Sequence, residues 1–301
     1  MQRSTVYVFW FSVSSLLLNT NICNCQITSK DLKEYYENVH NAELFVAFKD
    51  TSSAVNCYKV AFDCKLPFLI DLNNAIELYP YSQKDSTLYL LFDRWKEIKL
   101  SYYSDEGILS GEKSINNLAN YSWALNLVND DSVYKSRSEF HQELQSLFDN
   151  DQELRRKKIV GNRDSILRAE GIVMFENLQS LILKFGWPAP QSDGIYNVKI
   201  YPLILHGVYY CGLSDEFNTF LKEQVYLGKL NAHFYAKIID RFMDWNLNLP
   251  QLYGEWFTTQ SGNITISNIN GLDIRRKDLF LENYSEFCLK NHLTLPNEYD
   301  K

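Results

Sequence analysis

The sequence predicts an all-α protein, in which degenerate helix-hairpin repeats pack on a second helical domain that carries one small β-hairpin. Three observations lead to this fold class. The chain has 301 residues, of which 46% are hydrophobic and 22% charged, so it can form a packed core. Apolar residues recur at helical spacing in one segment after another. A single stretch, GNITISNI at 262–269, has the alternation and the β-branched residues of a strand.

The first 25 residues have the layout of a secretory signal peptide. Arg3 precedes an apolar run at 6–18, and a polar stretch follows that ends at Cys25. The run is too short to span a bilayer, so we place cleavage after Cys25 and expect an exported protein, periplasmic or extracellular, with no membrane span. Lipid attachment at Cys23 or Cys25 is the alternative, but the residues before them are not the small ones that such processing prefers.

Charge and cysteine spacing exclude several classes of site. The net charge of −7 argues against a nucleic-acid partner, which would require a basic face. Cys57 and Cys64 lie about two turns apart in one predicted helix, roughly 10 Å, which is beyond the reach of a disulfide. No CxxC or HExxH spacing occurs, so the sequence predicts no metal and no cofactor.

The region 26–135 reads as successive amphipathic helices. They are expected at 30–49, 51–63, 66–80 and 84–98, and Asp50 or Thr51 can cap the second. The sequence Lys-Asp recurs at Lys49 and Lys84, close to the roughly 34-residue period of tetratricopeptide repeats. Residues 57–95 resemble tetratricopeptide-like stretches of exported bacterial proteins, and this resemblance implies a platform of stacked helices.

A linker at 101–113 and a short helix at 114–128 lead to a domain boundary near residue 135. In the second domain, 136–301, helices are expected at 136–159, 165–186, 215–230, 231–248 and 276–291. The segment 195–210 is ambiguous, because Pro202 either begins a helix or kinks one.

Residues from about 143 to 290 resemble the bacterial domain-of-unknown-function 6624 family. The motifs that carry the resemblance occur in order as Asp151-Gln152 with Arg155, Gly186-Trp187-Pro188, His206, Asp240-Arg241, Gln251-Leu252-Tyr253-Gly254 and Asp273-Ile274-Arg275-Arg276. The chain departs from the family at Leu205, where Gln is usual, and at Glu255-Trp256, where Thr-Gln is usual. The resemblance implies a mostly helical fold and brings no established activity.

Two residues have a specific physical interest. His206 lies in an apolar run, where it is either a neutral general base or a core imidazole bonded to a carbonyl. Arg241 lies at the apolar edge of its predicted helix and cannot lose its charge. It therefore needs a carboxylate, a cluster of carbonyls or an anionic ligand, and Asp273 is our first choice of partner. Asp240 is expected near His233 on the opposite, solvated face.

The loop after this helix, QLYGEWFTTQSG at 251–262, is either the rim of a pocket or a cover for helix carbonyls. The candidate catalytic residues are His206, Arg241 and Tyr253. The candidate ligand-binding residues are Gln251, Asp240, Asp273 and Arg275.

Two functions follow from these observations. The first is a binding or scaffold protein for a protein or peptide, because helical repeats form concave surfaces and no complete nucleophile–base or metal set is visible. The alternative is a metal-independent hydrolase in which His206 is the general base and Arg241 holds an anion. The sequence does not identify a small-molecule ligand.

Overall fold

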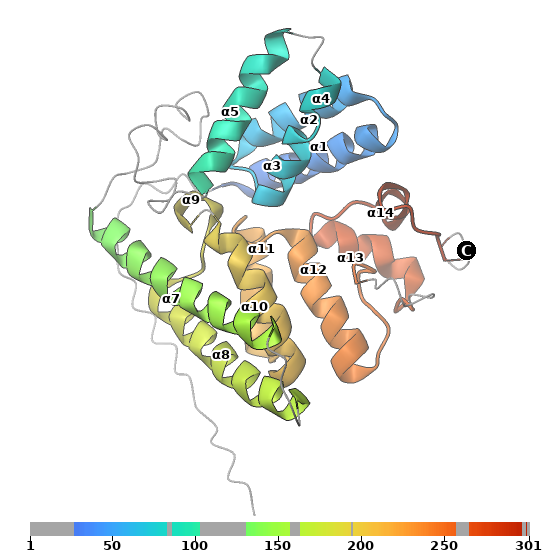
Figure 1. Cartoon of the computed structure of the whole chain (residues 1–301). Helices are drawn as coiled ribbons and strands as arrows, with labels where there is room; N and C mark the ends of the chain where they lie inside the picture. The colour runs from blue at the N-terminus through green and yellow to red at the C-terminus, as the bar shows by residue number, and fades with distance from the viewer. Residues whose placement is uncertain are drawn as a thin grey trace, which may run out of the picture.

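The computed structural model describes residues 27–82, 86–102, 131–156, 163–193, 195–256, 265–296 and 299. Within these ranges the protein is built of helices, which confirms the predicted fold class (Figure 1). The helices are α1 (Ser29–Ala47), α2 (Thr51–Cys64), α3 (Leu69–Ile76), α4 (Tyr79–Ser82), α5 (Ser86–Tyr102), α7 (Asp131–Arg156), α8 (Arg163–Phe185), α9 (Pro190–Asp193), α10 (Tyr196–Cys211), α11 (Asp215–Tyr226), α12 (Ala232–Arg241), α13 (Leu272–Asp278) and α14 (Tyr284–Lys290). The predicted signal peptide and the helix expected at 114–128 lie outside the described residues.

The first two helices are capped at their N-termini by side chains, and the cap of the second was predicted. The Thr28 side chain accepts from the backbone N–H of Asp31, whose side chain accepts in return, so α1 begins with a complete capping box. Asp50 caps α2 by accepting from Ser53. The apolar faces of α1 and α2 pack along each other, and α3 packs on α5. The tetratricopeptide-like repeat stays a prediction, although α1 and α2 do form a helical pair.

The helices form two groups that share one hydrophobic core. Figure 1 shows α1 to α5 at one end and α7 to α12 at the other, with α13 and α14 beside α12. One cluster of buried side chains runs from Leu32 on α1 to Leu281 after α13. α14 returns to pack against α1, so the end of the chain lies beside its first described helix. No helix in the described ranges has the length and apolarity that crossing a membrane requires.

The structure settles the ambiguous segment around Pro202. α10 continues through this residue from Tyr196 to Cys211 and ends at Gly212, whose φ of 79° is in the left-handed region. The continuous helix matters for the site below because it carries both His206 and Tyr209.

The predicted β-hairpin is not seen among the described residues. Gln251 and Ile266 form an isolated parallel bridge, in which the Gln251 N–H donates to Thr265 O and its carbonyl accepts from Ser267 N. A hairpin requires antiparallel pairing, and the left-handed backbone of Asn268 turns the chain into a short 3-10 helix at once. Residues 262–264 of the predicted strand lie outside the described ranges.

Candidate functional site

A buried carboxylate near the end of α7 organises the first part of the site. Asp151 is 1% exposed. Its carboxylate lies 2.9 Å from His206 Nδ1 and accepts from Arg155, one turn further along the helix, at 3.0 Å from Nε and 2.9 Å from Nη2. Burial alone raises the pKa of Asp151, but the hydrogen bonds from His206 and Arg155 outweigh it and lower the pKa below its usual value. Asp151 is therefore an anion held between two donors.

His206 is accessible and oriented. Its side chain is 21% exposed, so the apolar run around it does not seal it in the core. The partner of its Nδ1 is the Asp151 carboxylate and not a backbone carbonyl. A carboxylate acceptor keeps the proton on Nδ1, which leaves the lone pair on Nε2. Among the described residues no hydrogen-bond partner occupies Nε2, so this nitrogen is free to accept a proton.

Arg241, at the end of α12, lies among aromatic rings. Its guanidinium carbon is 4.4 Å from the ring centroid of Trp245, 5.1 Å from Trp256 and 5.8 Å from Tyr209. Its Nε atom is buried and has no hydrogen-bond partner in the described structure. Burial lowers the pKa of Arg241, and the charge of Arg155 lowers it further. Arg241 remains cationic because so high a pKa leaves it charged at any physiological pH.

The predicted pairing of Arg241 with Asp273 is wrong. Asp273 accepts instead from the backbone N–H of Tyr284 at 2.8 Å and from the Tyr299 hydroxyl at 2.5 Å, so it holds the start of α14. The aromatic rings take the place of the carboxylate that we expected beside Arg241, because a guanidinium is attracted to the face of an aromatic ring.

Arg275 also has a structural role. Its guanidinium donates to the carbonyls of Leu252, Ser267 and Asn268, at 3.0, 2.5 and 3.1 Å. These bonds fasten the loop after α12 to the segment before α13. Neither Asp273 nor Arg275 therefore presents an open polar group at Arg241.

Asp240 is fully buried, not on a solvated face as predicted. Its carboxylate accepts from the backbone N–H groups of Leu252, Tyr253 and Glu255 at 2.8, 2.9 and 2.7 Å. Burial raises the pKa of Asp240 to about 6, and the three N–H donors offset part of this effect. The loop covers this face of α12, which the helical pattern alone does not reveal.

Gln251 acts on Arg241 indirectly. Its side chain is bonded to both backbone groups of Trp256, accepting from N at 3.2 Å and donating to O at 2.5 Å. The closed loop puts the Trp256 ring against Arg241, with the ring of Trp245 5.6 Å away. Tyr253 is not part of this arrangement: its ring lies 6.4 Å from that of Tyr235.

The two parts of the site meet through Arg155 and α10. Arg155 shares the Asp151 carboxylate with His206, and its charge also acts on Arg241. Tyr209, which contacts the Arg241 guanidinium, lies three residues after His206 and so on a neighbouring part of the same helical face. We call Asp151, Arg155, His206 and Arg241, with the rings of Tyr209, Trp245 and Trp256, the Arg241 site.

A second polar cluster lies behind the loop. Arg276 is fully buried and donates to the carbonyls of Tyr253 and Glu282, at 2.6 and 2.7 Å. Its Nη2 lies 3.0 Å from Glu255 Oε1 and 3.5 Å from Glu282 Oε2. One group within the described ranges has the donors for a metal ion: His40, His233 and Glu282.

Comparison with protein families, curated proteins and solved structures found no match to this chain. The resemblance of residues 143–290 to the domain-of-unknown-function 6624 family therefore stays a prediction.

Proposed function

We propose that the Arg241 site binds an anionic substrate and that His206 acts there as the general base in its hydrolysis, without a metal ion. The observation that carries this proposal is the half-buried guanidinium of Arg241, which has no carboxylate partner in the described structure and an unbonded Nε. A partly desolvated charge without a counterion is costly, so a site that keeps one is suited to a ligand that supplies it.

The aromatic rings define how that ligand binds. Trp245 and Trp256 lie over the guanidinium, and such stacking leaves its in-plane N–H groups for hydrogen bonding. Arg binds carboxylate and phosphate groups through two parallel bonds of this kind. Arg155, which is paired with Asp151, lies close enough for its charge to act on Arg241 as well. The substrate class is therefore a molecule with a carboxylate or phosphate group.

His206 supplies the proton transfer. With the proton on Nδ1 directed to Asp151, Nε2 can take a proton from a water molecule that attacks the substrate. Asp151 then stabilises the imidazolium that forms, as a buried carboxylate does for the base of a catalytic triad.

A binding role without catalysis is the second candidate, and a separate observation favours it. The segment directly after Arg241 exposes large apolar side chains: Trp245 is 47%, Leu247 46% and Leu249 47% exposed. Such a surface beside a cation suits a peptide or protein with both apolar and acidic groups.

A panel of anionic nitrophenyl esters tests the proposal, with release of nitrophenolate as the readout: nitrophenyl phosphate, and nitrophenyl monoesters of dicarboxylic acids, which keep one free carboxylate. His206→Gln should lower kcat by about 10²–10⁴-fold, the usual contribution of a general base. Arg241→Met should act mainly on KM, and Arg168→Met on the exposed surface of α8 should change neither. Turnover that is equal in His206→Gln and the unmodified protein contradicts the catalytic role. Saturable binding of an anionic probe without turnover supports the binding role.

A further inference from the structure

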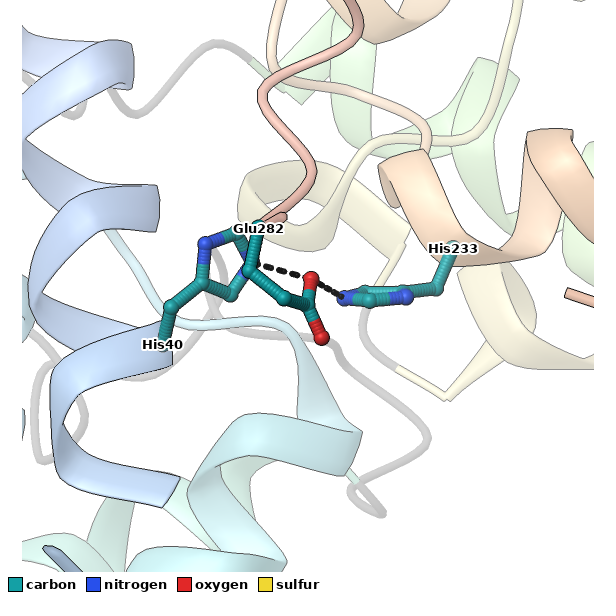
Figure 2. A group of neighbouring side chains, drawn as sticks. All are labelled: His40, His233 and Glu282. Carbon is teal, nitrogen blue, oxygen red and sulfur yellow. Dashed lines mark ion pairs between the residues drawn. The ribbon is translucent and has the colours of Figure 1, made fainter. Parts of the chain in front are cut away.

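The side chains of His40, His233 and Glu282 converge from three separate segments. Figure 2 shows His40 on α1, His233 on α12 and Glu282 on the segment before α14, each directed toward the other two. Their donor atoms all lie within 4.8 Å of one another. The Tyr36 hydroxyl, one turn before His40, accepts from the backbone N–H of Ala232 at 3.0 Å and so fastens the two helices together here.

The spacing of these donors suits a metal better than direct hydrogen bonds. Glu282 Oε2 lies 3.4 Å from His40 Nε2 and 3.5 Å from His233 Nε2, beyond the 2.7–3.2 Å or so of an N–H···O bond. Donors held at about 2.0–2.1 Å from a tetrahedral zinc ion are about 3.4 Å apart. His40 Nε2 and Glu282 Oε2 are buried, and neither has a hydrogen-bond partner in the described structure.

The surrounding groups hold the donors in the orientation that a metal requires. His233 Nδ1 lies 3.1 Å from Glu255 Oε1, so its proton is directed to that carboxylate and its Nε2 lone pair faces Glu282. Histidine ligands of zinc are oriented by a carboxylate in this way. Lys290 Nζ lies 2.6 Å from the other oxygen of Glu282, Oε1. Arg276 Nη2 lies 3.5 Å from Oε2 and makes no hydrogen bond to it, so Oε2 still lacks a hydrogen-bond partner in the described structure.

The local charge also favours a cation. The carboxylates of Glu43, Glu255 and Glu282 face the side chains of Arg276 and Lys290, which contact them at 2.5–3.5 Å. With both imidazoles neutral, three negative charges meet two positive ones, and one negative charge remains. A divalent ion neutralises this charge and leaves one positive charge, which a hydroxide on the ion's open position would balance. A proton on His233 would also neutralise it.

A cavity of about 520 Å³ has His40 and Glu282 in its wall and so reaches the cluster. A metal ion could enter from this side. Three protein ligands also leave a fourth position, which in zinc sites of this composition holds water or a substrate.

We infer that His40, His233 and Glu282 form a binding site for a divalent metal ion of the zinc type, open to the cavity between α1 and the segment before α14. Two imidazoles and one carboxylate are ligands that zinc and related transition metals share, while magnesium and calcium prefer oxygen alone. The sequence predicted no metal because its ligands are not near each other along the chain.

Calorimetric titration of the full chain with zinc chloride, after removal of metals with a chelator, tests this inference. We expect one zinc ion per chain, and a loss of affinity in His40→Gln greater than the about 10–100-fold that removing a second-shell partner costs. Glu255→Gln should lie within that smaller range. His292→Asn is the matched control: His292 is exposed and has a φ of 56°, which Asn tolerates.

Absence of zinc binding in the unmodified chain overturns the inference, as does equal affinity in His40→Gln. Should His40→Gln fail to fold, cobalt decides the question in the unmodified protein. The visible absorption of bound Co²⁺ should be that of a four- or five-coordinate site with nitrogen and oxygen ligands, and zinc should displace it. An octahedral spectrum with weak bands, or no displacement, contradicts the inference.

Discussion

Replacement of Arg276 by Met should strongly destabilise the fold, because this guanidinium is the centre of the buried cluster behind the loop. Two of its N–H groups donate to the carbonyls of Tyr253 and Glu282, and Nη2 lies between the carboxylates of Glu255 and Glu282. Removing one partner of a buried ion pair costs about 3–5 kcal/mol, because the remaining charge is uncompensated. A hydrogen bond from a charged group contributes about 1.5–3 kcal/mol.

These contributions overlap, because one desolvated guanidinium makes all the contacts. We therefore expect Arg276→Met to lower the free energy of unfolding by about 4–5 kcal/mol. Domains have a total stability of about 5–15 kcal/mol, so this is a large share. With a urea m-value of about 3 kcal/mol/M for a chain of this size, the unfolding midpoint should fall by about 1.5 M. Urea unfolding of the metal-free protein, followed by circular dichroism, measures this shift.

Two further variants distinguish the mechanism. Lys277→Met, at the exposed neighbouring position, should change the stability by less than about 0.5 kcal/mol. Adding Glu255→Gln to Arg276→Met should recover about 0.5–3 kcal/mol, because it removes one stranded carboxylate. A loss below about 1 kcal/mol for Arg276→Met, or no recovery in the double variant, would refute the reasoning.

Two other predictions concern Lys65, between α2 and α3, and Gly254, in the loop beside this cluster. Lys65 is fully buried, and burial lowers its pKa to about 7, so between pH 7 and the unfolded pKa of about 10.4 the unfolded chain binds the extra proton. The stability of the unmodified protein should therefore rise with pH in this window, by about 1.4 kcal/mol per pH unit relative to that of Lys65→Met. Urea unfolding of both proteins at pH 7.5 and 9 measures this rise, and an equal change in both would contradict the prediction. Gly254→Ala should destabilise by more than about 2 kcal/mol, because φ is 72° and the new methyl would lie 2.5 Å from Tyr284. Gly186→Ala, with a φ of 81° and open space around it, should cost only about 1 kcal/mol. Thermal unfolding of the two variants measures both costs, and equal costs would show that the contact with Tyr284 is unimportant.

The helices could be predicted from the sequence because their signals are local. The apolar period predicted α1 and α2, and the structure confirms Asp50 as the cap of α2. The strand-like alternation at 262–269 had a different cause in its described part. The side chain of Ile266 points inward because it packs on the small cluster around Leu272 and Tyr284. This packing requires no second strand. Alternation of apolar and polar residues indicates which face of an extended segment is buried. It does not indicate whether another strand pairs with that segment.

The candidate site could be predicted only in part. The helical pattern correctly put Arg241 at a buried edge, but its partners are rings from α10, from the short π-helix Phe242–Asn246 that continues α12, and from the loop. Asp151 and His206 are a pair that depends on how α7 packs on α10, which one sequence does not specify. The burial of Asp240 follows likewise from a loop that folds back over α12. The partners of these side chains are set by contacts between different helices and loops, which the periodicity within one helix does not indicate.

The proposed function depends most on the state of the Arg241 guanidinium, and nuclear magnetic resonance can follow it directly. The Nε–H signal of Arg241 in the ¹⁵N-labelled protein, assigned with Arg241→Lys, would be recorded during titration with inorganic phosphate and with acetate. We predict a saturable shift of this signal as an anion binds the guanidinium and supplies the acceptor that the buried Nε–H lacks. A signal that does not respond to either anion would contradict the account.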